Sequence, residues 1–136
     1  MKITKYDKTT SEVIRESAGY ICEVCGVSND TMQCMHDLSR TYVITRYDSR
    51  NLICGCASCH TKTTQDPHYH REVFIRIKGS EEVQLNRERA HSGDRLKPWE
   101  KDEIRKHWMN EIKRMKQLRS DGVTGKIELE VPEILL

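Results

Sequence analysis

Long hydrophobic runs and aromatic residues are scarce in this chain. No segment approaches the ~20 consecutive apolar residues of a membrane span, and the N-terminus lacks the basic start, apolar run and cleavage site of a secretory signal. We therefore expect a soluble, cytoplasmic protein without a membrane partner. A hydrophobic fraction of 36% with a single phenylalanine predicts one small domain whose thin apolar core needs another source of stability.

A large excess of charge is also missing. The net charge is +2 and the pI about 8.2, so composition alone does not indicate a strongly basic nucleic-acid-binding protein. The distribution of charge is more informative, because Arg40, Arg46 and Arg50 fall in one short stretch while acidic residues gather mainly after position 80. We expect a local basic face around these arginines.

Cysteine is the residue type that the chain does have in number. Four of the six cysteines form two Cys-x-x-Cys units, Cys22/Cys25 and Cys56/Cys59. In a reducing cytoplasm such pairs are more often metal ligands than disulfides, and two units can place four thiolates tetrahedrally around one zinc ion. We predict a structural Zn²⁺ site at these cysteines. The alternatives are disulfides, or Cys56 and Cys59 as small buried apolar residues.

The two remaining cysteines are Cys34 and Cys54. Cys54 could replace Cys56 as a ligand, but only the spacing of Cys56 and Cys59 matches that of the first unit. We therefore predict that Cys34 and Cys54 are packing residues. Because 30 residues separate Cys25 from Cys56, the ion would hold a substantial inserted element, and we expect the functional residues there.

Local patterns predict an α+β fold without internal repeats. Apolar spacing and end signals favour several helices, and Trp99, Ile104, Trp108, Ile112 and Met115 predict the packing face of the last one. The expected helices are Ser11–Tyr20, one from Cys56 to a break at Pro67, His68–Ile77, Glu81–Ala90 and Pro98–Arg119. The expected strands are Thr31–Asp37 and Tyr42–Thr45, joined near Ser39 and Arg40, with Asn51–Cys54 extended and a strand-like tail at Ile127–Val131.

Three polar residues accompany the cysteines: His36 ends the first predicted strand, Asn51 precedes the second cysteine pair, and His60 follows Cys59. With them, the chain resembles the zinc-containing HNH (His-Me finger) endonucleases, and in particular small phage proteins related to the NinG/Rap recombination nucleases. The resemblance rests on the order and spacing of Cys22-x-x-Cys25, Cys34-Met35-His36-Asp37-Leu38-Ser39-Arg40, Thr45-Arg46-Tyr47-Asp48, Asn51 and Cys56-x-x-Cys59-His60.

The resemblance implies a ββα-metal fold on a treble-clef-like zinc site, formed by residues 1–80, with 81–136 as a helical extension and short tail that pack on this core. It implies a metal-dependent endonuclease that hydrolyses phosphodiester bonds of nucleic acid, expected to be DNA. His36 would be the general base, Asn51 would hold the loop and orient the base, and His60 would bind a catalytic divalent metal, Mg²⁺ or another. Arg40 and Arg46 would contact phosphates.

The chain departs from the common pattern at Met35, where many relatives have a metal-binding Asp or His, and at Thr64, where some have another His. A non-catalytic zinc module that binds DNA or a protein is therefore the alternative function. A redox role for the Cys-x-x-Cys units is weaker, because no thioredoxin-like βαβ pattern surrounds them. Asp37, Asp48, His68 and His70 are further candidates for a supporting role, although the polar surroundings of the two histidines favour solvent exposure.

Overall fold

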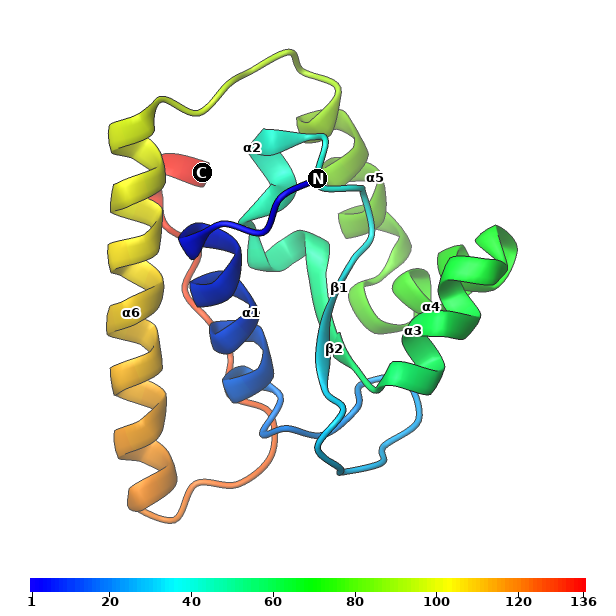
Figure 1. The fold of residues 1–136 in the computed structure, drawn as a ribbon, viewed down its shortest axis with the longest axis vertical. Coiled ribbons are helices and arrows are strands. Elements are labelled where there is room, and N and C mark those ends of the chain that lie inside the picture. Colours follow the sequence, from blue (N-terminus) through cyan, green and yellow to red (C-terminus); the bar gives the residue numbers. More distant parts are fainter.

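A small antiparallel sheet stands between two groups of helices. The computed structural model describes all residues from 1 to 136, and its sheet pairs β1 (Gln33–His36) with β2 (Leu52–Gly55). Helices α1 and α6 lie on one side of the sheet and α3, α4 and α5 on the other (Figure 1). The helices are α1 (Lys5–Ser17), α2 (Val43–Arg46), α3 (Ala57–Gln65), α4 (Pro67–Lys78), α5 (Ser80–Ala90) and α6 (Pro98–Ser120).

The predicted mixed composition of helix and strand is confirmed, as are the helices that follow the second cysteine pair. Pro67 ends one helix and begins the next, because the Asp66 side chain accepts hydrogen bonds from the first amides of α4. Helix α6 begins at Pro98 as predicted. None of the helices is long and apolar enough to cross a membrane.

The two faces of the sheet are covered by separate apolar clusters. On one face, Val13 of α1 packs in a cluster with Trp108 and Met115 of α6. On the other face, Met35 and Ile53 contact the cluster formed by Val73, Phe74 and Val83. Successive residues of a strand point to opposite faces, so Cys34 and His36 lie on the side of β1 opposite to Met35. Met35 is thereby placed in the core.

Met35 also determines what its partner strand can carry. Gly55 lies at the end of β2, and a Cβ atom added there would overlap the sulfur atom of Met35. The backbone of β2 approaches this side chain closely because residue 55 has no side chain of its own. Met35 and Gly55 therefore pack as a pair across the sheet.

The first helix begins earlier than the sequence predicted. Thr4, and not Ser11, is its N-cap, and the Asp7 carboxylate accepts a hydrogen bond from the Thr4 amide at 2.8 Å. This capping box satisfies amides at the start of the helix, so the polar residues before Ser11 join the helix. Helix α1 ends at Ser17, followed by Gly19 with a φ of +66°.

Two predicted strands and one predicted core residue are wrong. Residues Tyr42–Thr45 lie at the short helix α2 rather than in a strand, and β1 pairs instead with β2. Residues Ile127–Val131 form no strand, because Ile127 exchanges hydrogen bonds with Ser17 of α1 and the tail has no neighbouring strand. Trp99 is exposed at the first turn of α6, whereas the rest of its predicted stripe is buried.

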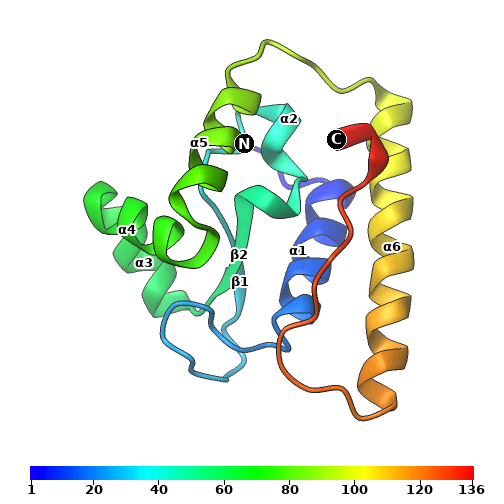
Figure 2. The same cartoon turned by 180° about the vertical axis from the view of Figure 1, so that it is seen from behind.

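The C-terminal part of the chain packs closely on the N-terminal part. Helix α6 lies beside α1, and the segment after it runs back along both helices (Figure 2). The indole nitrogen of Trp108 donates a hydrogen bond to the Tyr47 carbonyl at 2.9 Å, and Arg50 donates to the Leu135 carbonyl at 2.7 Å. These bonds attach α6 and the tail to the segment between the two strands.

Candidate functional site

The four cysteines of the two Cys-x-x-Cys units come together at one end of the sheet. Cys22 and Cys25 lie in the turn after α1, and Cys56 is the N-cap of α3, which contains Cys59. Their four sulfur atoms all lie within 4.8 Å of one another. The predicted grouping is confirmed, and these four cysteines could hold a metal ion such as zinc.

The distances and donors at this cluster suit a tetrahedral ion. The sulfurs of Cys25 and Cys56 are 3.9 Å apart, close to the ~3.8 Å expected between ligands that each lie ~2.3 Å from a zinc ion. The Cys25 amide points at the Cys22 sulfur at 3.4 Å, and the Cys59 amide at the Cys56 sulfur at 3.5 Å. Burial raises the pKa of Cys22, but backbone amide donors lower it further, to about 7, which favours the thiolate.

Cys34 and Cys54 lie outside this cluster, as predicted. They face each other across β1 and β2, and Cys54 is part of the apolar cluster that Cys34 contacts. Burial raises the pKa of each thiol to about 12. Both therefore remain neutral and act as packing residues.

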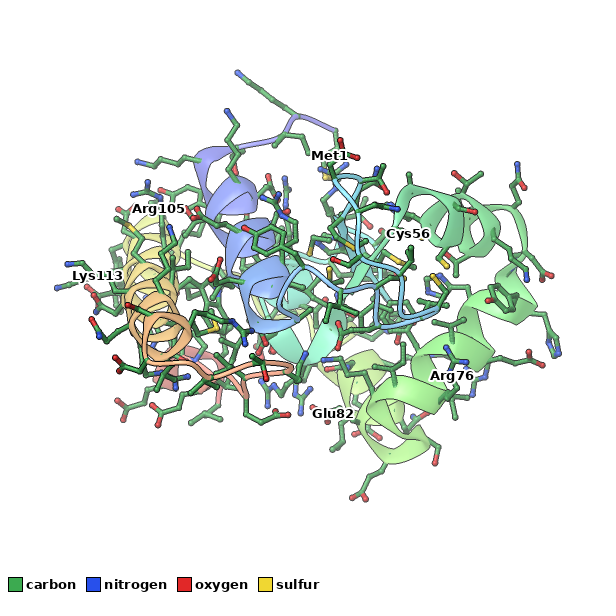
Figure 3. All side chains as sticks on the ribbon, turned by 90° about the horizontal axis from the view of Figure 1, so that it is seen from below. Met1, Cys56, Arg76, Glu82, Arg105 and Lys113 are labelled. Atoms are coloured by element: carbon green, nitrogen blue, oxygen red, sulfur yellow. The ribbon has the colours of Figure 1, made fainter.

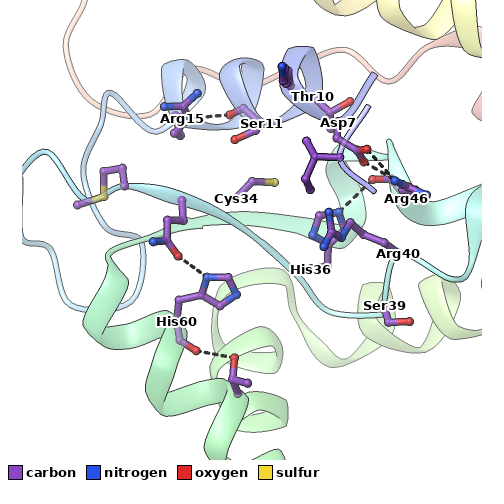
Figure 4. A pocket seen from close by; sticks show the side chains of 15 residues that line it. Asp7, Thr10, Ser11, Arg15, Cys34, His36, Ser39, Arg40, Arg46 and His60 are labelled. Atoms are coloured by element: carbon purple, nitrogen blue, oxygen red, sulfur yellow. Dashed lines mark hydrogen bonds and ion pairs between the residues drawn. The ribbon is translucent and has the colours of Figure 1, made fainter. Parts of the chain in front are cut away.

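A polar pocket of about 830 Å³ adjoins the sheet, and it brings two of the predicted residues together. Helix α1 forms one wall, β1 contributes its Cys34 and His36 side, and α3 contributes His60 and Thr64 (Figure 4). His36 and His60 therefore line the same pocket, although they come from different elements.

His36 is held as a single neutral tautomer. Its Nε2 atom lies 3.2 Å from the backbone carbonyl oxygen of Arg46. Since a carbonyl oxygen can only accept, Nε2 donates and Nδ1 keeps a free lone pair. Burial is the largest cause that lowers the pKa of His36, to about 4, so the imidazole is neutral at physiological pH.

Asn51 holds the loop between the two strands. Its fully buried side chain donates hydrogen bonds to the carbonyls of Leu38 at 3.1 Å and Thr45 at 3.2 Å, and it accepts one from the Leu38 amide at 2.9 Å. Thr45 precedes Arg46, whose carbonyl accepts the bond from His36. Asn51 thus acts on the loop that positions His36 and makes no hydrogen bond with the imidazole itself.

Arg40 and Arg46 differ, although the sequence predicted the same role for both. The Arg46 guanidinium is buried and forms a bidentate ion pair with Asp7, with distances of 2.8 and 2.7 Å. Its charge is therefore balanced inside the protein, which removes it from the predicted contact with phosphate. Arg40 also lines the pocket and makes no ion pair. Of the two, Arg40 is the one available to a ligand.

His60 lies in the first turn of α3, directly after the metal-site cysteine Cys59. Its Nδ1 atom lies 2.6 Å from the side-chain oxygen of Gln33, so Nδ1 donates and Nε2 keeps a free lone pair. Apart from the cysteine cluster, no three His, Cys, Asp or Glu side chains converge as a metal site. An ion at His60 would therefore complete its coordination shell with water and ligand oxygens.

One whole wall of the pocket and one histidine contact were not predicted from the sequence. Lys8, Ser11 and Arg15 of α1 line the pocket, but their spacing is also that of any solvated helix face, so no signal singled them out. His70 was expected to be exposed. Instead, its Nε2 atom lies 3.0 Å from the Asp37 carbonyl oxygen and 3.2 Å from the Asp37 carboxylate.

Comparisons with protein-family models, with curated proteins and with solved structures give no match.

Proposed function

We propose that this protein is a metal-dependent endonuclease of the HNH type that hydrolyses phosphodiester bonds in DNA. The observation that carries the proposal is the state of His36: a neutral imidazole with a fixed donor at Nε2 and a free lone pair at Nδ1, in a pocket that it shares with His60 and Arg40. A general base for water needs this combination of protonation state and access.

The proposed reaction is an in-line hydrolysis. His36 Nδ1 takes a proton from water, the resulting hydroxide attacks phosphorus, and the bond from phosphorus to the sugar oxygen breaks. The sugar oxygen leaves as an alkoxide and takes a proton from a solvent water molecule. Arg40 neutralises charge on the phosphate. A divalent cation at His60, Mg²⁺ or another, would stabilise the charge that develops on the phosphoryl oxygens. The Arg46 carbonyl keeps the proton on Nε2 throughout, so Nδ1 stays the base.

We further propose that the four cysteines bind Zn²⁺ and that residues 1–80 form a ββα-metal core. The antiparallel strands β1 and β2 are followed directly by α3, and this order supports the proposal. Asn51 fixes the loop between the strands, and α6 with the tail packs on α1 as an extension of the core.

A second candidate is a zinc module that binds DNA or a protein without cutting. It is favoured by the absence of a second protein ligand near His60, since Met35 is in the core and Thr64 replaces a histidine. The two candidates differ in whether purified protein turns over its substrate.

The deciding experiment is nicking of supercoiled plasmid DNA with divalent-metal titration. We expect His36→Ala to reduce cleavage roughly 10²- to 10⁴-fold with DNA binding nearly unchanged, because only the base is lost. His60→Ala should raise the metal concentration needed for cleavage, and excess metal should restore part of the rate. Excess metal should not rescue His36→Ala.

His68→Ala is the matched control, because the His68 side chain is 86% exposed and Glu72 is its only side-chain ion-pair partner. It should cleave at the wild-type rate. Cleavage by His36→Ala at that same rate would exclude the catalytic role. Tight DNA binding by a wild-type protein that shows no cleavage with any divalent metal would favour the non-catalytic module instead.

A further inference from the structure

Helix α1 presents a basic face to the pocket that the proposed reaction does not use. Lys8, Ser11 and Arg15 line the pocket from this helix, opposite α3 and its His60. Residues 8, 11 and 15 lie three and four positions apart, so they share one side of the helix. Two cationic residues therefore line the same pocket as His36.

The charges in this pocket are not balanced by the protein. Asp7 is the single acidic residue in the pocket wall, and Arg46 already forms a bidentate ion pair with it. Lys8, Arg15 and Arg40 make no ion pair with any acidic side chain. The pocket consequently carries a surplus of positive charge, which attracts an anionic ligand.

The two α1 cations are also free to donate. Arg15 directs its Nε atom to the Ser11 carbonyl at 3.3 Å, which orients the side chain (Figure 4) and leaves both terminal nitrogens without a hydrogen-bond partner. The Lys8 ammonium is exposed and has no hydrogen-bond partner either. The Arg15 guanidinium also lies over the Tyr20 ring at 5.8 Å, a contact that uses the face of the guanidinium and leaves its N–H groups free to donate in the plane. An approaching phosphate would therefore displace no hydrogen bond or ion pair.

The spacing along α1 fits a polyanion better than one small anion. Lys8 and Arg15 are seven residues apart, about 10.5 Å along the helix axis at 1.5 Å per residue. A nucleic-acid strand advances about 3.4 Å per phosphate along its axis, so the same length spans about three phosphates. One mononucleotide could not engage both side chains in the same way.

We infer that α1 is the second wall of a nucleic-acid-binding cleft, in which Lys8 and Arg15 hold the phosphates of the strand whose scissile phosphate lies between Arg40 and His36. This inference rests on the proposed function for the identity of the ligand. It assigns to an apparently structural helix the role of gripping the strand beside the site of cleavage.

The test measures binding of a fluorescent DNA hairpin with a duplex stem and single-stranded tails, as a function of salt concentration. His36→Ala protein serves as the background, so that the probe stays intact. Adding Lys8→Gln and Arg15→Gln together should weaken binding on the order of 10- to 100-fold at low salt. It should also flatten the slope of log K against log salt by about 1.4 to 1.8, because two phosphate contacts are lost.

The matched control replaces Lys106 and Lys113 of α6 by Gln in the same background. These exposed lysines are also seven residues apart and make no ion pair. Their replacement removes two positive charges, as the α1 double substitution does. Figure 3 shows Lys113 on the outer side of α6, far from the metal-site residue Cys56. This control should bind and respond to salt as the background protein does.

The outcomes separate the two proposals. Equal behaviour of the α1 and α6 double variants, in folded proteins of the same melting temperature, would overturn the role of α1 while the nuclease proposal stands. A failure of the background protein to bind the hairpin at any salt concentration would reject both proposals. Weaker binding and a flatter slope in the α1 variant alone would support the cleft.

Discussion

The two ends of the small sheet carry irregular segments that are held in place by different means. At the Gly55 end, the turn after α1 and the start of α3 meet through four cysteine sulfurs within 4.8 Å of one another. At the His36 end, residues 37–51 form a loop that the Asn51 side chain joins to itself through three hydrogen bonds. The cysteine end could be held together by a bound metal ion, whereas the loop at the other end is held by the hydrogen bonds of Asn51.

The two ends would contribute to the proposed reaction in different ways. The cysteine end supports His60, the proposed cation ligand, through the start of α3, whereas the loop end positions the proposed general base through the Arg46 carbonyl. We therefore expect damage to the cysteine end to destabilise the whole fold. Damage to the loop end should affect activity out of proportion to its effect on folding.

Removal of the metal should have the largest effect. A structural zinc site contributes on the order of 10 kcal/mol to folding, and the apolar core here is thin. Excess chelator, or Cys22→Ser, should therefore unfold the protein, as followed by circular dichroism, with the loss of one zinc ion per chain in metal analysis.

Cys34→Ala is the control for this experiment, because Cys34 is a cysteine outside the cluster. It should keep its full metal content and respond to the chelator as the wild type does. A wild-type protein that retained its melting temperature after complete removal of metal would contradict the assignment of the cysteine end.

Replacement of Asn51 should have an intermediate effect. Asn51→Ala leaves the amide and the carbonyl of Leu38 without their partner, while the Thr45 carbonyl keeps the bond from the Asp48 amide. We therefore expect the free energy of unfolding to fall by about 2 kcal/mol or more. Cleavage should fall further than this loss predicts, because the loop would release the Arg46 carbonyl. Denaturant unfolding and plasmid nicking at a temperature where the variant is folded measure the two effects.

Two variants sharpen this prediction. Asn110→Ala, at an exposed position of α6, should change neither quantity. Asn51→Asp keeps an acceptor for the Leu38 amide but cannot donate to the two carbonyls, so it should resemble Asn51→Ala. If Asn51→Ala lost its zinc but kept its rate, the proposed division between the two ends would be wrong.

The pH dependence of cleavage should show the smallest and most specific effect. Because burial lowers the pKa of His36 to about 4 in the free protein, the base stays neutral as the pH falls through the usual histidine range. We expect kcat/KM to remain nearly constant from pH 8 down to about 5 and to decrease below that pH. The acid-side decrease of kcat should begin at a higher pH than that of kcat/KM, because bound phosphate raises the pKa of His36 in the complex.

Circular dichroism at each pH defines the range in which the fold is intact, and His68→Ala should give the same profile as the wild type. A midpoint of kcat/KM near 6.5 in that range would mean that the base is a solvated histidine rather than His36.

The accuracy of the sequence predictions depended on how local each signal was. The grouping of the two cysteine pairs and the start of a helix at Pro98 were predicted from short-range patterns in the sequence. Both predictions agree with the structure. Val43 and Ile44 favour strands by their branched side chains, but the hydrogen bonds of Asn51 fold this loop back and leave only a short helix there. Tertiary contacts outweighed local preference.

The pocket could be predicted only in part for a related reason. His36, His60 and Arg40 are near the cysteines in sequence, so one motif indicated them together. The wall formed by Lys8 and Arg15 comes from a helix whose polar face is unremarkable by itself. The ion pair of Arg46 with Asp7 joins residues 39 positions apart in the sequence, and no local pattern could indicate that pair.

The close packing of Met35 on Gly55 has a consequence for how this protein can vary. Any side chain at position 55 would occupy the space of the Met35 sulfur. Substitutions at the two positions are therefore coupled. A chain that gains even a methyl group at 55 must first have a shorter residue at 35. A shorter residue at position 35 would leave room for a side chain at position 55, so substitutions at these two positions should occur together.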